Sequence, residues 1–441
     1  MTWGSRRALL PACLRRLIAA LRLLGEHLRL QRITTNYPDY LRQFYKTRSE
    51  LVSQPYAAQH EALMRDAYGW ADFWSTALGK LGYEVDEVVS NAEPMQRAWA
   101  SEHGLSYNDN NWLLEITTAQ IKAFRPTVLF VNDYVTYSAD YLRQLKAECS
   151  FIHLVVGWCG AAYSNASIFN EYDVVLSGAP ELVRTFRSQG HRCEHLHLAF
   201  DARILERLRA AEPGVDFGFM GTITKKNEFH NSREQLILDL LERTPLQIWT
   251  HAPSPSLQER GNLLVRQWAF DAVRAASRVG VPDAMLKSLP LAGKVKRWKE
   301  RPALPPQIDE RILRIAHSPL FGMEMFQQLQ RTRVSLNIHV DIARTHASNM
   351  RLYEATGVGS CLLTDAKPNL KEVFEPDVEV VAYANADECV EKLNYLLAHE
   401  DERRAIAKAG QQRTLRDHSF DNRAAHLDEI IQKGLRRRAS Q

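Results

Sequence analysis

The pattern of apolar and polar positions predicts two successive rounds of alternating strands and helices. From about Ile33 onward, short apolar runs alternate with amphipathic stretches, a rhythm typical of βαβ units that build a parallel sheet. In the first round the expected strands cover 32–36, 84–90, 127–132, 151–157, 173–177 and 195–199. The expected helices cover 56–81, 94–103, 112–124, 138–148 and 180–189. Together these elements predict one Rossmann-like domain.

A second round begins near residue 206. Its expected strands cover 216–221, 246–250, 334–339, 360–364 and 378–383. Its expected helices cover 232–243 (with Ser232 as N-cap), 322–332, 349–356 and 386–398, followed by a charged helical tail that could cross back. The prediction is therefore an α/β protein with two Rossmann-like domains facing a central cleft. We place the domains at 33–205 and 206–420, and a C-terminal helix with a basic tail at 421–441.

An insertion at about 252–318 interrupts the second round. It is rich in proline and carries a basic run at 294–301. Insertions of this length are usually functional or mobile. The interpretation we favour is a solvated helical excursion.

Residues 1–32 form a separate segment, predicted to be a basic amphipathic helix. Its basic residues are Arg6, Arg7, Arg15, Arg16, Arg22, Arg29 and Arg32, against one acid, Glu26. Its apolar residues recur every three or four positions, at Leu9, Leu10, Leu14, Leu17, Ile18, Leu21, Leu24 and Leu28. This composition suits an anionic membrane surface. It equally suits packing on the protein body or on a second subunit, and it resembles a mitochondrial presequence.

Composition narrows the class of protein further. The 441 residues are 45% hydrophobic and 24% charged, as in soluble globular proteins. No apolar run approaches the roughly 20 residues needed to span a bilayer, and a net charge of +4 gives no signature of nucleic-acid binding. The six cysteines are scattered without metal-ligand spacing, which indicates a reducing compartment. We expect a cytoplasmic protein, either free or peripheral on the inner membrane face.

Residues 345–359 (THASNMRLYEATGVG) carry the strongest chemical signal. They read as a loop that opens a helix, with Ser348 or Asn349 placed to cap it. Free amides and the helix dipole at such a terminus suit a diphosphate. Glu354, about one and a half turns later, could accept the hydroxyl protons of a ribose, or it could simply pair with Arg351. Gly357 and Gly359 would then let the helix end and the next strand pack closely.

Around this segment the chain resembles the group 1 glycosyltransferases of the GT-B fold, and within them the CgeB-like branch. The motifs are Leu-Asn-Ile-His ending at His339, Asn-x-Arg-x-Tyr-Glu ending at Glu354, and Leu-Thr-Asp ending at Asp365. Further matches are Glu-x-x-Phe-x-Pro from Glu372, His-Ser-Phe-x-x-Arg from His418, and Tyr-Pro-x-Tyr-Leu from Tyr37.

The resemblance implies that Glu354 holds the ribose of a nucleotide-diphosphate sugar. His346 occupies the position where the wider group often carries a glutamate that touches the donor sugar, a departure from the group pattern. The group also places basic residues after the first strand of its second domain. Here the corresponding positions are Gly221, Thr222, Lys225, Lys226 and Arg233. The resemblance implies neither a metal nor a cofactor, and no Asp-x-Asp motif occurs.

The catalytic residues are less well defined. Asp133, directly after the third strand, is the best-placed base, with Asp72 and His60 behind it. His339, at the end of a strand, could bond phosphate or donor hydroxyls. Many retaining group 1 enzymes carry a histidine at the far end of a strand of the first domain, where this chain has Trp158 and Cys159. The stereochemical outcome stays open.

The leading hypothesis is glycosyl transfer from a nucleotide sugar to a glycan, lipid-linked or protein acceptor in surface glycan, glycolipid or glycoprotein assembly. Two alternatives remain: a sugar-nucleotide epimerase of the same fold, and a non-catalytic scaffold in a glycosylation complex.

Overall fold

The computed structural model describes residues 28–160, 163, 166–223, 231–251, 257–278, 301–302, 308–339 and 345–440. The chain divides into two compact units, Met1–Gly218 with Phe321–Gln441, and Phe219–Leu320. Each unit is described by itself.

The first sheet has six strands in the order β2-β1-β3-β4-β5-β6. The strands are β1 Arg29–Thr34, β2 Glu84–Val89, β3 Val128–Val131, β4 Leu154–Trp158, β5 Val174–Ser177 and β6 Cys193–His195. All the pairings are parallel. β3 and β5 are buried along their whole length, which explains why they read as unbroken apolar runs.

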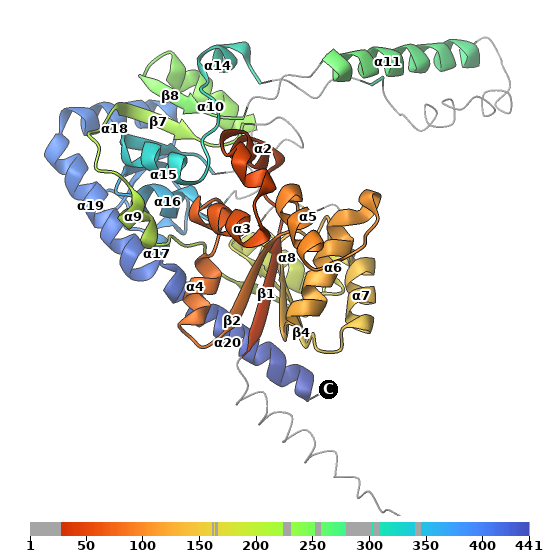
Figure 1. Cartoon of the computed structure of the whole chain (residues 1–441). Coiled ribbons are helices and arrows are strands. Elements are labelled where there is room, and N and C mark those ends of the chain that lie inside the picture. The colour runs from red at the N-terminus through yellow and green to blue at the C-terminus, as the bar shows by residue number, and fades with distance from the viewer. Residues whose placement is uncertain are drawn as a thin grey trace, which may run out of the picture. The chain divides into compact units, whose positions relative to one another are not determined.

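Helices surround this sheet (Figure 1). They are α2 Pro38–Thr47, α3 Tyr56–Arg65, α4 Phe73–Gly79, α5 Glu93–Glu102, α6 Trp112–Phe124, α7 Ala139–Glu148, α8 Pro180–Ser188 and α9 Arg203–Arg207. Three 3₁₀ turns, η1 Ser49–Ser53, η2 Asp109–Asn111 and η3 Ala166–Phe169, join them. The single helix expected over 56–81 is wrong, because α3 and α4 are separate. Ala67, Gly69 and Ala71 lie between them with positive φ, a conformation that an α-helix cannot contain.

The N-terminal segment also differs from its prediction. Residues 1–27 lie outside the described residues, but Arg29 to Arg32 belong to β1 and not to a helix. Arg32 is buried and forms an ion pair with the buried Glu87 of β2. Its guanidinium also donates a 2.8 Å hydrogen bond to the backbone oxygen of Ala71. Arg32 is thus a core residue of the first sheet.

The second sheet has five strands in the order β11-β10-β9-β7-β8. They are β7 Val215–Met220, β8 Leu246–Trp249, β9 Thr332–Asn337, β10 Cys361–Asp365 and β11 Val381–Tyr383. Neighbouring helices of the first unit are α15 Gly322–Gln330, α16 Arg351–Gly357, α17 Leu370–Val373, α18 Ala386–Ala398 and α19 Glu400–Asp417. Two sheets of this kind confirm the predicted pair of Rossmann-like domains, the GT-B fold.

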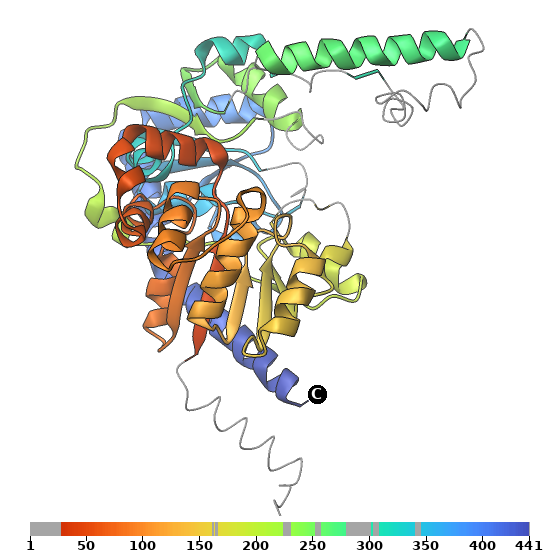
Figure 2. The ribbon, with the colours of Figure 1, turned by 45° about the vertical axis from the view of Figure 1, so that its right-hand side comes forward.

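The C-terminal helix α20 (Phe420–Ala439) returns to the first sheet (Figure 2). Phe420 packs its ring against Phe73 and Trp74 of α4 at centroid distances of 5.1 Å. Further along the helix, Asp428 accepts a hydrogen bond from the hydroxyl of Tyr83, and Arg438 pairs with Asp173. The expectation that the helical tail crosses back is confirmed.

The second unit holds β8 with α10 Asn231–Leu241, α11 Leu257–Arg278 and α14 Glu310–Ile315. α10 begins at Asn231, so Ser232 lies inside the helix and the predicted N-cap is wrong. α11 and α14 fall within the predicted insertion, and α11 exposes Leu264, Val265 and Trp268. The helical interpretation of the insertion therefore holds for its described residues.

Candidate functional site

The candidate site is built at the carboxyl ends of β9 and β10. In parallel α/β sheets, ligands bind at this edge. Asn337 ends β9, His339 lies two residues beyond it, and Asp365 ends β10. The pairing of Asn337 with Thr364 aligns the two strands, which brings His339 next to Asp365.

His339 and Asp365 form a buried pair. Oδ1 of Asp365 accepts hydrogen bonds from the backbone N–H of His339 at 3.0 Å and from its Nδ1 at 2.6 Å. The other carboxylate oxygen lies 3.1 Å from Nζ of Lys367. Burial by itself would raise the pKa of Asp365, but the hydrogen bonds from His339 and the charges of His339 and Lys367 lower it to about 2. The carboxylate is therefore ionised near neutral pH and holds the ring with its Nδ1 protonated.

This arrangement leaves Nε2 of His339 without a hydrogen bond among the described residues. The residue is only 2% exposed, so bulk solvent satisfies this atom poorly. A buried polar atom without a partner requires an explanation, and a bound ligand or water is the usual one. Nε2 of His339 is thus available to a ligand.

Asn349 shows the same feature. Its amide nitrogen donates to Oδ1 of Asn337 at 2.6 Å, and Asn337 in turn donates to Thr364 at 2.9 Å. Oδ1 of Asn349 is buried and has no hydrogen bond in the described part of the chain. The predicted capping role is wrong, because α16 begins at Arg351 with Met350 as its N-cap; neither Ser348 nor Asn349 caps it.

Glu354 lies on α16 and is 7% exposed. Its Oε2 accepts a 2.7 Å hydrogen bond from Arg351, and the same guanidinium nitrogen of Arg351 lies 3.2 Å from the sulfur of Met325. Burial raises the pKa of Glu354, and the charge of Arg351 opposes the rise. Glu354 thus pairs with Arg351 through one oxygen, and no hydrogen bond to its other oxygen is described. The two interpretations from the sequence, pairing with Arg351 and ribose binding, are therefore compatible with each other.

The glycines at the end of α16 behave as expected. The helix ends at Gly357, and Gly359 has a φ of +85°, the left-handed conformation that glycine adopts without strain. A side chain at Gly357 would place its Cβ 2.4 Å from the ring of Phe200. Gly357 is therefore closely packed, but its neighbour is Phe200, whereas the prediction named the next strand.

His346 contacts Glu181, which lies on helix α8 beside the first sheet. Its Nδ1 lies 2.5 Å from Oε1 of Glu181 and 2.8 Å from the hydroxyl of Thr345. Thr345 donates a short hydrogen bond to the same oxygen of Glu181. The structure thus places His346 in a histidine–carboxylate pair. Glu181 was not among the sequence candidates; its place in the first turn after β5 was the available signal.

Both carboxylate oxygens of Asp133 already accept hydrogen bonds from other residues of the protein. Oδ1 accepts from the backbone N–H groups of Val135 and Thr136, at 2.9 and 3.0 Å. Oδ2 accepts from the hydroxyls of Thr35 and Thr136, at 2.8 and 2.6 Å. Four donors around one carboxylate stabilise the turn after β3. The catalytic assignment of Asp133 stays a prediction.

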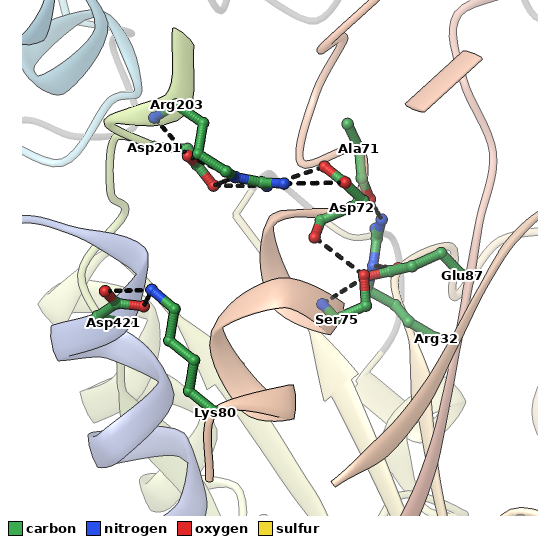
Figure 3. Close-up of polar contacts among 9 residues, drawn as sticks. All are labelled: Arg32, Ala71, Asp72, Ser75, Lys80, Glu87, Asp201, Arg203 and Asp421. Carbon is green, nitrogen blue, oxygen red and sulfur yellow. Dashed lines mark hydrogen bonds and ion pairs between the residues drawn. The ribbon is translucent and has the colours of Figure 1, made fainter. Parts of the chain in front are cut away.

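The two weaker base candidates, Asp72 and His60, also have partners, and Figure 3 shows those of Asp72. Both oxygens of Asp72 pair with Arg203, at 3.0 and 2.9 Å, and Arg203 also binds Asp201. Nε2 of His60 donates to the backbone oxygen of Glu87 at 2.7 Å. These contacts join α4, α9 and the first sheet, which is a structural role.

The predicted basic loop belongs to the second unit. Gly221 and Thr222 directly follow β7, and NH1 of Arg233 donates a 2.6 Å hydrogen bond to the backbone oxygen of Thr222. Arg233 is therefore held at the end of this strand. Lys225 and Lys226 lie outside the described residues.

The described residues contain no group of three or more His, Cys, Asp or Glu side chains arranged to hold a metal ion. None of their helices is both long enough and apolar enough to cross a membrane.

Comparisons with known proteins bear on the family and on the fold. Residues 266–429 match the family described as glycosyl transferase-like, a stretch shorter than half of the chain. A glycosyltransferase structure from Rickettsia africae is 8% identical, covering 93% of this chain and 99% of that one, with a TM-score of 0.50. The Anabaena HepE structure with UDP-glucose is 11% identical, covering 92% and 100%, with a TM-score of 0.49. No curated protein matches the chain. The fold is that of the GT-B glycosyltransferases, and the segment 266–429, which includes most of the candidate site, matches the glycosyl transferase-like family.

Proposed function

We propose that the chain is a glycosyltransferase that moves a sugar from a nucleotide-diphosphate donor to an acceptor. The observation that carries the proposal is the carboxylate of Glu354, buried on α16 beside the carboxyl edge of the second sheet. Arg351 occupies one oxygen of this carboxylate. The other oxygen would accept hydroxyl protons of the donor's ribose, which is the role that the group 1 resemblance implies.

The neighbouring side chains supply further donor contacts. Nε2 of His339 and Oδ1 of Asn349 are buried and have no hydrogen-bond partner among the described residues, and the same is true of Oε2 of Glu181. We assign the first two, with Ser348 and His346, to the sugar and diphosphate of the donor. Gly221, Thr222, Lys225, Lys226 and Arg233 would stabilise the departing nucleoside diphosphate, because cations placed where charge develops lower the barrier.

Our proposal for the acceptor is based on the composition of the chain and on its resemblance to the group 1 glycosyltransferases. We propose a glycan, lipid-linked or protein acceptor in surface glycan, glycolipid or glycoprotein assembly, in the CgeB-like branch, with no metal requirement. Residues 1–27 would hold the enzyme at the cytoplasmic face of an anionic membrane through their arginines and leucines.

A thermal-shift screen tests the donor site directly. Purified protein is heated with UDP, GDP, dTDP, CMP and their common sugar conjugates. A ligand at 100 times its Kd adds about 2.7 kcal/mol to the folded state, so one base should raise the Tm clearly. Glu354→Gln should strongly reduce this shift, because it replaces one carboxylate oxygen by an NH2 group, which can accept a hydrogen bond neither from Arg351 nor from a ribose hydroxyl.

The matched control is Glu391→Gln, an exposed carboxylate on α18, which should keep the shift. A folded Glu354→Gln protein with unchanged nucleotide affinity would contradict the ribose assignment. If no nucleotide or nucleotide sugar shifts the wild-type Tm, the donor proposal fails as a whole.

A further inference from the structure

Glu181 and His346 join two regions that lie 165 residues apart in sequence. Glu181 lies in the first turn of α8, which follows β5 of the first sheet. His346 lies in the loop that precedes α16 of the second sheet. A single histidine–carboxylate pair thus connects the two sheets' loops beside the candidate donor site.

The geometry defines which nitrogen of His346 is free. Nδ1 is 2.5 Å from an oxygen of Glu181, and a carboxylate can only accept a hydrogen bond. Burial by itself would raise the pKa of Glu181, but the hydrogen bonds from Thr345 and His346 lower it, so the carboxylate stays ionised. Nδ1 therefore carries the proton, and Nε2 of the neutral ring presents a lone pair.

The surroundings of His346 allow a substrate to reach it. Its side chain is 20% exposed, in contrast to the fully buried side chain of His339. Glu181 from α8 and His195 at the end of β6 both interact electrostatically with His346. Burial lowers the pKa of His195, so His195 is neutral near pH 7 and Glu181 is the charged neighbour.

We propose that His346 is the general base of the transfer reaction and that Glu181 is its positioning residue. This inference rests on the proposed glycosyltransferase function and deepens it. Nε2 of His346 takes the proton from the attacking hydroxyl of the acceptor as the hydroxyl oxygen bonds to the anomeric carbon. The bond from that carbon to the diphosphate breaks, and its electron pair leaves with the nucleoside diphosphate. The proton stays on His346 until product release.

The alternatives within the site support this choice. The carboxylate of Asp133 already accepts four hydrogen bonds, and both oxygens of Asp72 face Arg203. His339 is too deeply buried to meet an acceptor hydroxyl. His346 combines a free nitrogen, partial exposure and a carboxylate that stabilises the imidazolium formed in the reaction.

The test uses the nucleotide sugar that gives the largest thermal shift, with water as acceptor and release of nucleoside diphosphate as readout. His346→Gln should slow release about 10²- to 10⁴-fold, the usual contribution of a general base. Glu181→Gln should slow it about tenfold to a hundredfold through misplacement of the ring. In both variants the loss of kcat should exceed any loss of donor affinity, although His346 also lies among the donor contacts.

The pH profile separates this role from a structural one. The wild type should lose kcat/KM at low pH, where a general base is no longer free to accept a proton. His346→Gln should remove this loss at low pH. Glu171→Gln, which removes a carboxylate paired with Arg143 and Lys146, and His399→Gln, an exposed histidine, should change neither rate nor profile.

The outcomes distinguish the two proposals. Absence of nucleotide binding would overturn the proposed function. Binding and turnover that are unaffected by Glu181→Gln and His346→Gln would overturn only the general-base assignment. Nitrogen NMR of His346 in the donor-bound enzyme decides the case even without measurable hydrolysis: a proton on Nδ1 supports the proposal, and a proton on Nε2 alone contradicts it.

Discussion

Asp133 and His339 occupy equivalent positions in the two sheets and behave differently. Each lies two residues beyond the end of a central parallel strand, β3 for Asp133 and β9 for His339. Asp133 accepts four hydrogen bonds from its own turn and from Thr35. His339 uses Nδ1 for Asp365 and keeps a buried Nε2 without a partner in the described residues.

This difference shows that position at the carboxyl edge does not by itself make a residue functional. The deciding property is whether the folded chain already satisfies the side chain. A saturated group stabilises a turn, whereas an unsatisfied buried group is available to a ligand. By this criterion the second sheet offers the better donor site, and Asp133 is expected to contribute to stability.

The largest effect is expected from Asp133→Ala. Loss of four hydrogen bonds to an ionised carboxylate should lower the free energy of unfolding by about 2–4 kcal/mol. Thermal unfolding measures the loss, and nucleotide affinity of the folded variant should stay unchanged. Asp140→Ala, an exposed carboxylate on the neighbouring helix, is the control. A stable Asp133→Ala protein without activity would instead make Asp133 catalytic.

In Asp365→Asn, the free energy of unfolding should depend less on pH under acidic conditions than it does in the wild type. The pKa of Asp365 falls from 3.8 to about 2 on folding, so its ionised form stabilises the folded state by about 2 kcal/mol. This contribution is complete above pH 4 and is lost as the pH falls from about 4 to 2. Unfolding followed across this range should therefore show a weaker pH dependence in the variant than in the wild type.

His339→Asn should separate the two functions of this side chain. The asparagine amide can still donate to Asp365, but it has no atom in place of Nε2. Donor affinity, measured by calorimetry, should fall about tenfold, or 1.4 kcal/mol, while acid stability stays near the wild type. His339→Gln, whose amide approximates Nε2 and not Nδ1, should do the reverse. Equal effects of both variants on affinity would show that Nε2 has no special role.

The smallest effect is expected from Lys367→Met. Lys367 lies 3.1 Å from Asp365 and contributes less than His339 to its low pKa. Stability at neutral pH should fall by less than about 1 kcal/mol. If Lys367→Met lowers the free energy of unfolding more than Asp365→Asn does, then Lys367, and not His339, is the main partner of the Asp365 carboxylate.

The architecture was predictable because parallel sheets impose a simple pattern on the chain. Buried strands such as β3 and β5 read as apolar runs between amphipathic helices. Local signals also indicated that α16 ends near Gly357. Such features depend on neighbouring residues only.

Contacts between distant residues were not predictable in the same way. Glu181 meets His346 only because the fold brings α8 to the loop before α16. Arg32 looked like part of a basic helix, and its buried pairing with Glu87 depends on the register of β1 with β2. In the break between α3 and α4, the backbone oxygen of Asp66 accepts a hydrogen bond from the backbone N–H of Met323 of α15, a contact that the local sequence does not reveal.

The return of α20 means that the chain passes between the two sheets a second time, beside the first passage. Phe200 pairs in parallel with Ser419, and its backbone N–H donates to the oxygen of His418 at 2.9 Å. The two segments are hydrogen-bonded to each other at this point, so a break in one of them leaves the other connection in place. Cleavage in the exposed segment 209–214 should therefore leave the two fragments associated. They should separate on a denaturing gel and elute together on native gel filtration; separate elution would show that one connection alone maintains the assembly.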